Sequence, residues 1–186
     1  EHGIFGYTRV PEEYYDAVIS WFSRRHHWKP RREWFIYTSG VVPALSAVIK
    51  ALTNVGDKVL TLTPVYNCFF SSIRNNGCEL DSCALRYEDN TFSIDYEDLE
   101  RRAADPKTTL MLLCNPHNPS GRVWTREELQ RIGDICIKNN VVVVADEIHC
   151  ELVHPGFTYT PFASVSEEFQ KHSVTCVAPS KAFNIA

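Results

Sequence analysis

Two hydrophobic patterns alternate along this chain. Short runs of apolar, mostly β-branched residues predict strands that are buried on both faces, whereas segments with an apolar residue at every third or fourth position predict amphipathic helices. Strands are expected at residues 34–38, 58–62, 78–87, 108–114, 141–147 and 173–177. Helices are expected to start at or just after Pro11, Pro43, Tyr66, Asp95 and Thr125.

The alternation of strands with helices indicates the fold class. Parallel neighbouring strands need a crossover connection, which is usually a helix. We therefore predict an α/β fold in three α/β/α layers with a mainly parallel central sheet. Residues 1–30 are expected to form a lead-in and a helix, and residues 31–186 to form one large domain. The sequence begins at Glu1 without a methionine and ends shortly after Lys181, so we expect it to be part of a longer chain.

The strongest single signal is the run of four valines, 141–144, that leads into Ala145, Asp146 and Glu147. Such a run is typical of an interior strand, and here the strand ends in charge. Open α/β sheets bind their ligands at the carboxyl ends of the strands. A second apolar strand, residues 173–177, ends before Lys181 at what would be the same edge. An acid and a lysine at one edge suggest a cofactor that is cationic or carries a carbonyl group.

Composition and charge exclude several classes of function. Apolar residues make up 44% of the chain and charged residues 23%, as in ordinary globular proteins. The net charge of -4 gives no general attraction to nucleic acid or to an anionic membrane, and no apolar run is long enough to span a bilayer. Seven cysteines without a CxxC motif argue against a disulfide framework and against a metal site. We therefore expect a cytoplasmic protein with a small-molecule ligand.

Three loops could contribute to a ligand site. The turn at residues 39–42, SGVV, leads into a helix whose free N–H groups could hold a phosphate, with a plain turn as the alternative. Tyr66 follows a strand and could lie flat on a cofactor ring, or it could be an ordinary tyrosine. The loop at residues 115–121, NPHNPSG, offers two asparagine amides and a histidine, or it is only a tight connection.

Asp146 and Lys181 each have an ordinary interpretation, as a helix cap or surface carboxylate and as a solvated lysine. Together they indicate a specific chemistry. A carboxylate can keep a pyridine nitrogen protonated, and a desolvated lysine can form a Schiff base with an aldehyde. With a phosphate-binding turn, a stacking aromatic ring and an amide donor, they are the parts that a pyridoxal 5'-phosphate (PLP) site requires.

Five motifs, in their order and spacing, resemble those of the fold type I PLP enzymes of the aminotransferase class I/II family. They are SGVVPAL, TPVY, NPHNPSG, VVVVADEIH and APSKAFNIA. More narrowly, the chain resembles the MalY/PatB-type C-S lyases, a group of cystathionine β-lyases and cysteine-S-conjugate β-lyases. The resemblance extends from HGIFGYTR to the end of the chain. It implies that residues 31–186 form most of a PLP-binding large domain and that a C-terminal small domain lies outside this sequence.

The resemblance implies roles for four residues at the cofactor ring. Lys181 looks like the Schiff-base lysine, which also moves the α-proton. Asp146 is expected to pair with the pyridine nitrogen, and Asn118 to hydrogen-bond the ring hydroxyl. Tyr66 is expected to stack on the ring, and we count it with Asp146 and Lys181 as catalytic.

Other residues are implied in binding at the edges of the cofactor. The backbone N–H groups of Val41 and Val42, with the Ser180 hydroxyl, are expected to hold the phosphate. Tyr7 resembles the tyrosine that reaches the site of a neighbouring subunit, which implies a homodimer. His149, also counted as cofactor-binding, stands where classical aspartate aminotransferases often have tyrosine. A further departure is the alanine at 178, where many aminotransferases have a phosphate-binding hydroxyl.

The resemblance favours a PLP-dependent β-lyase that cleaves cystathionine or a similar cysteine S-conjugate to a thiol, pyruvate and ammonia. Lys181 would remove the α-proton, and the protonated ring held by Asp146 would take up the negative charge. An aminotransferase is the alternative, since it uses the same residues up to that point. A regulatory or binding protein that keeps the PLP fold is the third possibility. The arginine for the substrate carboxylate is expected beyond residue 186, so the substrate side chain stays unassigned.

Overall fold

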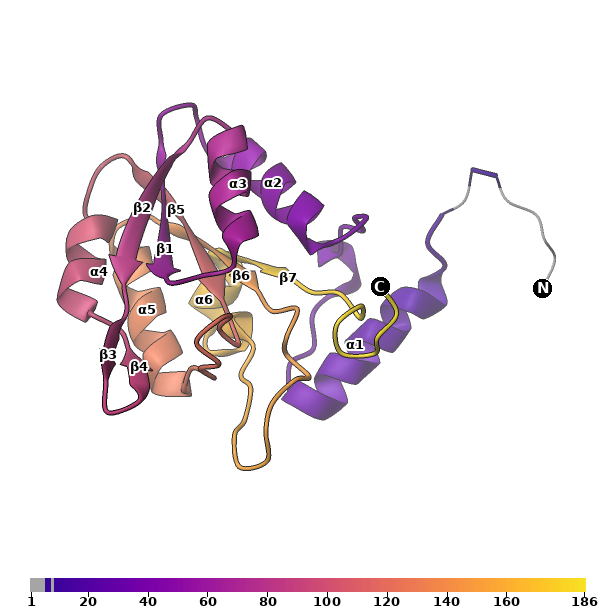
Figure 1. The fold of residues 1–186 in the computed structure, drawn as a ribbon. Coiled ribbons are helices and arrows are strands. Elements are labelled where there is room, and N and C mark those ends of the chain that lie inside the picture. Colours follow the sequence, from indigo (N-terminus) through magenta and orange to yellow (C-terminus); the bar gives the residue numbers. More distant parts are fainter. Residues whose placement is uncertain (1–5, 8) are drawn as a thin grey trace. The chain divides into compact units, whose positions relative to one another are not determined.

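The computed structural model describes residues 6, 7 and 9–186. The chain divides into two compact units, with the boundary between Thr38 and Ser39. The described part of the first unit holds an α-helix, α1 (Glu12–His26), and a short 3-10 helix, η1 (Arg32–Trp34). The second unit holds the sheet and the other helices, which are labelled in Figure 1.

In the first unit, helix α1 follows the sequence prediction but residues 34–38 do not. The helix starts after Pro11, as expected, and buries Tyr15 and Phe22. The strand predicted at 34–38 was wrong, because these residues have no neighbouring strand within the described part of the unit. Ile36 is 88% exposed. A strand needs a partner for its N–H and C=O groups, and an apolar run alone does not supply one.

Five strands of the second unit form one sheet. They are β1 (Lys58–Thr63), β2 (Glu79–Ala84), β5 (Thr108–Cys114), β6 (Val142–Asp146) and β7 (Ser173–Cys176). Their order is β2-β1-β5-β6-β7, and every neighbouring pair is parallel, so the predicted α/β fold is confirmed. The order changes direction between β1 and β5. At such a switch point, the carboxyl ends of the strands form the crevice in which α/β proteins bind ligands.

Helices cover both faces of this sheet. One face packs against α2 (Val41–Leu52) and α3 (Asn67–Asn75), and the other against α4 (Tyr96–Ala103) and α5 (Arg126–Lys138). Strand β6 shows why both faces must be apolar. Val144 belongs to the cluster under α2 and α3, whereas Val143 and Ala145 belong to the cluster under α4 and α5. Alternation of side chains along a strand therefore accounts for the run of valines.

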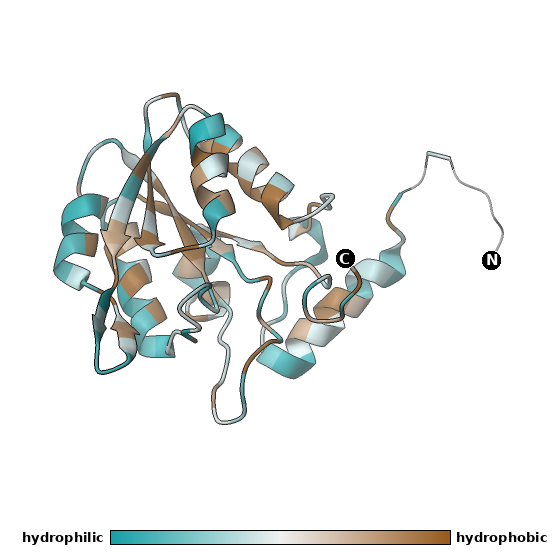
Figure 2. Cartoon of the chain, in the orientation of Figure 1, coloured by the Kyte–Doolittle hydropathy of each residue, from teal (hydrophilic) through white to brown (hydrophobic). Residues whose placement is uncertain are grey.

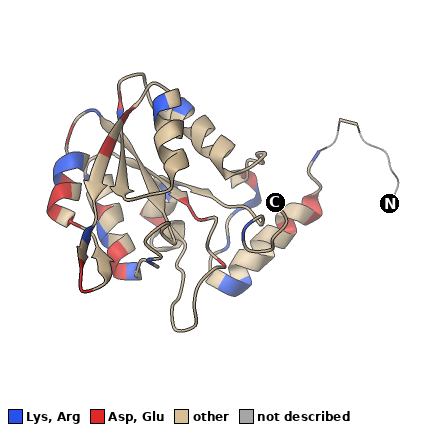
Figure 3. Ribbon diagram, viewed as in Figure 1, with Lys and Arg blue, Asp and Glu red and all other residues tan. Residues whose placement is uncertain are grey.

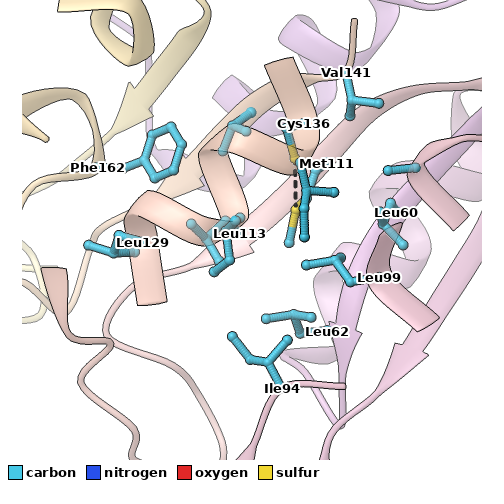
Figure 4. Close-up of a cluster of buried hydrophobic side chains, with 14 of the residues drawn as sticks. Leu60, Leu62, Ile94, Leu99, Met111, Leu113, Leu129, Cys136, Val141 and Phe162 are labelled. Atoms are coloured by element: carbon cyan, nitrogen blue, oxygen red, sulfur yellow. Dashed lines mark hydrogen bonds between the residues drawn. The ribbon is translucent and has the colours of Figure 1, made fainter. Parts of the chain in front are cut away.

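The larger of the two clusters lies between the sheet and helices α4 and α5 (Figure 4). Leu60, Met111 and Leu113 project from the strands toward Leu99 of α4 and Cys136 of α5, and all five side chains are fully buried. The Cys136 Sγ lies 3.6 Å from the Met111 Sδ. Burying each large apolar side chain contributes about 1.5–3 kcal/mol. Figure 2 shows hydrophobic colours on much of the central strands and a mixture of hydrophobic and hydrophilic colours on α4 and α5, as expected for helices with one buried face.

The single strand predicted at residues 78–87 is instead two strands. Strand β2 ends at Ala84, and β3 (Arg86–Glu88) then pairs with β4 (Thr91–Ser93) in an antiparallel hairpin. Asp89 and Asn90 connect these strands with φ values of 49° and 58°. Asp and Asn tolerate this left-handed conformation, which two-residue hairpin turns require.

The segment between β6 and β7 holds two short helices, η2 (Phe162–Ser164) and α6 (Glu167–Lys171).

Charged residues of both signs occur on α1, α4 and α5 (Figure 3). This mixture agrees with the small net charge of the whole chain. None of the described helices is long and apolar enough to cross a membrane.

Candidate functional site

The residues predicted for the cofactor ring follow the carboxyl ends of four strands. Tyr66 follows β1, Asn118 follows β5, Asp146 is the last residue of β6, and Lys181 follows β7. Because these strands are parallel, their carboxyl ends lie at one edge of the sheet. All four residues belong to the second unit. The topology therefore places them at the edge where a ligand was expected.

Asp146 is a buried acid for which the described residues supply no counter-ion. It is in register with Cys114 on β5 and with Cys176 on β7, and it is only 4% exposed. Its Oδ1 accepts a hydrogen bond of 3.2 Å from the backbone N–H of Ile148. Burial raises the pKa of Asp146 to about 6, and no positively charged group of the described chain acts on it. Desolvation disfavours the charged carboxylate. A cationic ligand that paired with it would therefore lower the free-energy cost of burying this charge.

The two flanking cysteines keep the surroundings of Asp146 neutral. Burial raises the pKa of Cys114 and of Cys176 to about 12, and the charge of Asp146 contributes to both shifts. Both therefore stay as thiols at neutral pH and behave as small apolar side chains. Their thiols leave the Asp146 charge unbalanced.

Helix α2 starts with a group of N–H donors. Its N-cap, Gly40, has no side chain that could accept from the first turn, and its φ and ψ are 158° and 171°. The helix begins at Val41, two residues before the expected start, so that Pro43 occupies the third position. The N–H groups of Val41 and Val42 are the free donors of this turn, since proline has none. An anion such as a phosphate fits this end of the helix.

Tyr66 is the N-cap residue of α3 and is 37% exposed. A hydrogen bond with Cys68 is the main cause that raises the pKa of Tyr66, and the charge of Asp146 also contributes. The tyrosine is therefore near enough to Asp146 to sense its charge. An exposed aromatic ring next to a buried acid suits a flat, positively charged ring.

A cleft of about 330 Å³ opens beside Asn118 and His149. One wall is the loop at residues 115–121, and the other is the segment at residues 148–158, which contributes Leu152, His154 and Phe157. Burial, followed by the positive charge of Lys181, lowers the pKa of His149. His149 is thus a neutral imidazole near the Lys181 amine. The cleft therefore brings Asn118 and His149 together, and the charge of Lys181 acts on His149.

Two further predicted residues are Ser180 and Tyr7. Ser180 lies in the turn after β7, where its carbonyl accepts from Ile185 at 3.2 Å. Tyr7 belongs to the first unit and is exposed. Its expected role concerns a neighbouring subunit and stays a prediction.

The loop at residues 115–121 is both a tight connection and part of the cleft wall. His117 is buried, its Nδ1 lies 2.8 Å from the Ser120 hydroxyl, and its Nε2 lies 3.4 Å from the Leu62 carbonyl. Burial lowers the pKa of His117 to about 4, so it serves as a neutral framework residue. Asn118 lines the cleft, whereas Asn115 is fully buried behind it.

Sequence reasoning missed a buried network centred on Glu147. This side chain is 0% exposed and accepts hydrogen bonds from Asn115, Tyr159 and the backbone of Phe162. The signal in the sequence is an acid at the end of a strand that is apolar on both faces. Its partners are distant in sequence, so the motif alone does not reveal them.

Comparison with known proteins finds relatives for the whole chain. Residues 2–186 match the family Aminotransferase class I and II. The chain is 48% identical over 186 residues to cystathionine beta-lyase PatB of Bacillus subtilis (strain 168), and 32% identical over 185 residues to protein MalY of Escherichia coli (strain K12). The matches cover 100% and 99% of this chain.

Solved structures agree with this result. Cystalysin from Treponema denticola, which contains a PLP cofactor, matches 98% of this chain with a TM-score of 0.96 and 41% identity. A PLP-bound C-S lyase from Staphylococcus hominis matches 98% of the chain with a TM-score of 0.94 and 34% identity. The chain covers 46% of each of these two structures. It also spans about half the length of the curated relatives, namely 48% of PatB and 47% of MalY.

Proposed function

Since this chain belongs to the aminotransferase class I and II family, within fold type I of the PLP enzymes, we propose that the protein is a PLP-dependent C-S β-lyase. Its substrates are cystathionine or similar cysteine S-conjugates, and its products are a thiol, pyruvate and ammonia. The observation that carries the proposal is the buried carboxylate of Asp146, which has no counter-ion in the described chain. The 48% identity to a cystathionine beta-lyase supports the lyase reaction over others of the family.

The described residues fit PLP because they combine a buried negative charge with a group of N–H and O–H donors. Asp146 offers a buried negative charge to a protonated pyridine nitrogen. The uncapped first turn of α2, with the N–H groups of Val41 and Val42, offers donors to a phosphate. The Ser180 hydroxyl is proposed as a further donor to that phosphate.

When bound, PLP supplies an aldehyde that can link to an amine and a ring that withdraws electrons from the α-carbon of an amino acid. Lys181 is proposed to carry the cofactor on its Nζ and, when that nitrogen is free, to take the α-proton. Asp146 would hold the ring nitrogen in its protonated form, because a buried carboxylate favours a positively charged partner. Tyr66 would cover the ring and exclude water from one side, Asn118 would hydrogen-bond the ring hydroxyl, and the neutral His149 would lie beside the cofactor.

The proposal also covers the quaternary structure, the location and the domain organisation. A homodimer would let Tyr7 reach the site of the neighbouring subunit. Seven free cysteines, six of them buried, are compatible with the reducing cytoplasm. We also propose that residues 31–186 act as the PLP-binding large domain and that a small domain outside this sequence completes the site.

The family also contains aminotransferases, so the two reactions need a direct test. The complete protein is incubated with cystathionine and PLP but without any keto acid. A β-lyase releases pyruvate and a free thiol under these conditions. Strict dependence of turnover on an added keto acid would show an aminotransferase instead.

A regulatory protein that keeps the PLP fold is the remaining alternative. Replacing Lys181 with alanine is expected to abolish turnover, because Lys181 is the lysine proposed to carry the cofactor and to take the α-proton. If a biological effect of the protein persisted in this inactive variant, the regulatory function would be favoured.

A further inference from the structure

Glu147 is the most completely buried acid of the second unit that has no assigned task. Its side chain is 0% exposed, and burial raises its pKa to about 7. Its Oε1 accepts from the Asn115 Nδ2 and from the Phe162 N–H, each at 2.9 Å, and its Oε2 accepts from the Tyr159 hydroxyl. A carboxyl group at this depth is tolerated because these donors replace the water that it has lost.

The donors belong to two segments that lie far apart in the sequence. Asn115 is the first residue of the loop at 115–121, directly after β5. Tyr159 and Phe162 follow the segment at 148–158, which itself starts next to Glu147. The Asn115 Nδ2 also donates to the Thr160 carbonyl at 3.0 Å, so the two segments are joined to each other as well as to Glu147.

These two segments are the walls of the cleft beside Asn118 and His149. The first wall carries Asn118, and the second carries His149, Leu152 and Phe157. Glu147 joins the two ends of the second wall, because it directly precedes the segment at 148–158 and accepts hydrogen bonds from Tyr159 and Phe162, which follow it. The same side chain holds the start of the first wall. Both walls are therefore hydrogen-bonded to one buried carboxyl group.

We propose that Glu147 is a positioning residue that fixes both walls of the cleft and thereby holds Asn118 and His149 in place for the cofactor. The link to the cofactor rests on the proposed function, whereas the fixing of the walls does not. The hydrogen bonds of Glu147, and not its charge, carry this role. Glutamine can keep them, since its Oε1 can accept from Asn115 and Phe162 while its Nε2 donates to the Tyr159 hydroxyl oxygen.

The test compares Glu147→Gln with Glu147→Ala in the complete protein without cofactor. Amide hydrogen exchange is measured in the wall segments, residues 115–121 and 148–162, and in β5 and β6. In the alanine variant, exchange in both walls is expected to rise at least about tenfold. PLP, titrated afterwards, is expected to bind at least about tenfold more weakly. In the glutamine variant both quantities are expected to stay within about threefold of wild type.

Two further variants keep the result interpretable. Leu99→Ala creates a defect in the core under α4, at a residue that does not line the cleft, and is expected to lower global stability without loosening the walls selectively. If Glu147→Ala does not fold, Tyr159→Phe removes one donor only and is expected to raise exchange in residues 148–162.

Three outcomes would overturn the proposal. They are unchanged walls in both Glu147→Ala and Tyr159→Phe, a glutamine variant as impaired as the alanine variant, or the same selective loosening in Leu99→Ala. If the wild-type protein did not bind PLP, the proposed function would fail, and the exchange data would still decide the role of Glu147.

Discussion

Asp146 and Glu147 are consecutive residues whose carboxyl groups lie on opposite faces of the central sheet. Asp146 lies in register between Cys114 and Cys176, on the face covered by α2 and α3. Glu147 binds the backbone of Phe162, which belongs to the core on the other face. Because side chains alternate along a strand, two adjacent acids at one strand end reach different surroundings. One acid is left for a ligand and the other is bound into the framework.

Replacing Asp146 with asparagine is expected to separate function from stability. The amide cannot balance a protonated pyridine, so turnover is expected to fall by at least about 100-fold. The same change removes a carboxylate whose charge is disfavoured by burial. At pH 8 the cofactor-free variant is therefore expected to be at least as stable as wild type. Urea unfolding and turnover of cystathionine check the two effects, and a loss of stability in parallel with the loss of turnover would contradict this account.

The stability of the cofactor-free protein is expected to depend on pH through Glu147. Burial raises the pKa of Glu147 from 4.5 to about 7, so the folded protein binds this proton more tightly than the unfolded chain does. Its contribution to stability is therefore complete below pH 4.5 and is lost as the pH rises to about 7.

The comparison with Glu147→Gln isolates this contribution, because the other acids titrate in both proteins. Between pH 4.5 and 7 the free energy of unfolding of wild type is expected to fall, relative to the variant, by on the order of 2 kcal/mol. Urea unfolding at several pH values measures the difference. A difference that stays constant over this range would show that Glu147 titrates normally.

His117 is expected to matter for stability and not for proton transfer. Its ring contacts Trp124 with a centroid distance of 5.3 Å, and its two nitrogens are held by Ser120 and Leu62. His117→Ala is expected to lower the free energy of unfolding by about 2–3 kcal/mol. The exposed His154 on the cleft wall is the matched control, for which alanine is expected to cost less than about 0.5 kcal/mol. Equal effects at the two positions would argue against the framework role.

Gly133 in the middle of α5 is expected to be intolerant of alanine. Alanine favours a helix over glycine by about 1 kcal/mol. However, a Cβ at this position would lie 2.2 Å from two ring atoms of Phe169, which is itself buried and stacked on Phe162 at 5.1 Å. The steric term dominates, and we expect a net loss of about 2 kcal/mol in urea unfolding. Partial recovery in the double variant Gly133→Ala, Phe169→Leu would support this cause, and a stabilised Gly133→Ala variant would refute it.

Much of the fold was predictable because its signals are local. The strand at 108–114 and the start of α5 follow from short stretches of sequence. The structure confirms both, and Thr125 and Glu128 form a capping box at the start of α5. The strand predicted at 34–38 was wrong because strand formation also depends on a neighbour that the local sequence does not show. The hairpin of β3 and β4 was missed for a related reason, since its turn residues, Asp89 and Asn90, contain no glycine.

The candidate site was predictable in outline only. The position of Asp146 at a strand end placed it at the ligand edge, because parallel strands share that edge. Its lack of a counter-ion was not visible, since this depends on every residue that packs around it. The network of Glu147 was missed because its partners are 12 to 32 positions away in the sequence. Only the folded chain brings them together.

The most direct test of the central claim is the absorption spectrum of the complete protein with added PLP, before and after reduction with borohydride, followed by mapping of the modified peptide. We predict a visible band from the cofactor bound to a lysine, and its fixation by borohydride on Lys181 alone. The absence of such a band, or attachment scattered over several lysines, would contradict the assignment of this edge of the sheet as a PLP site.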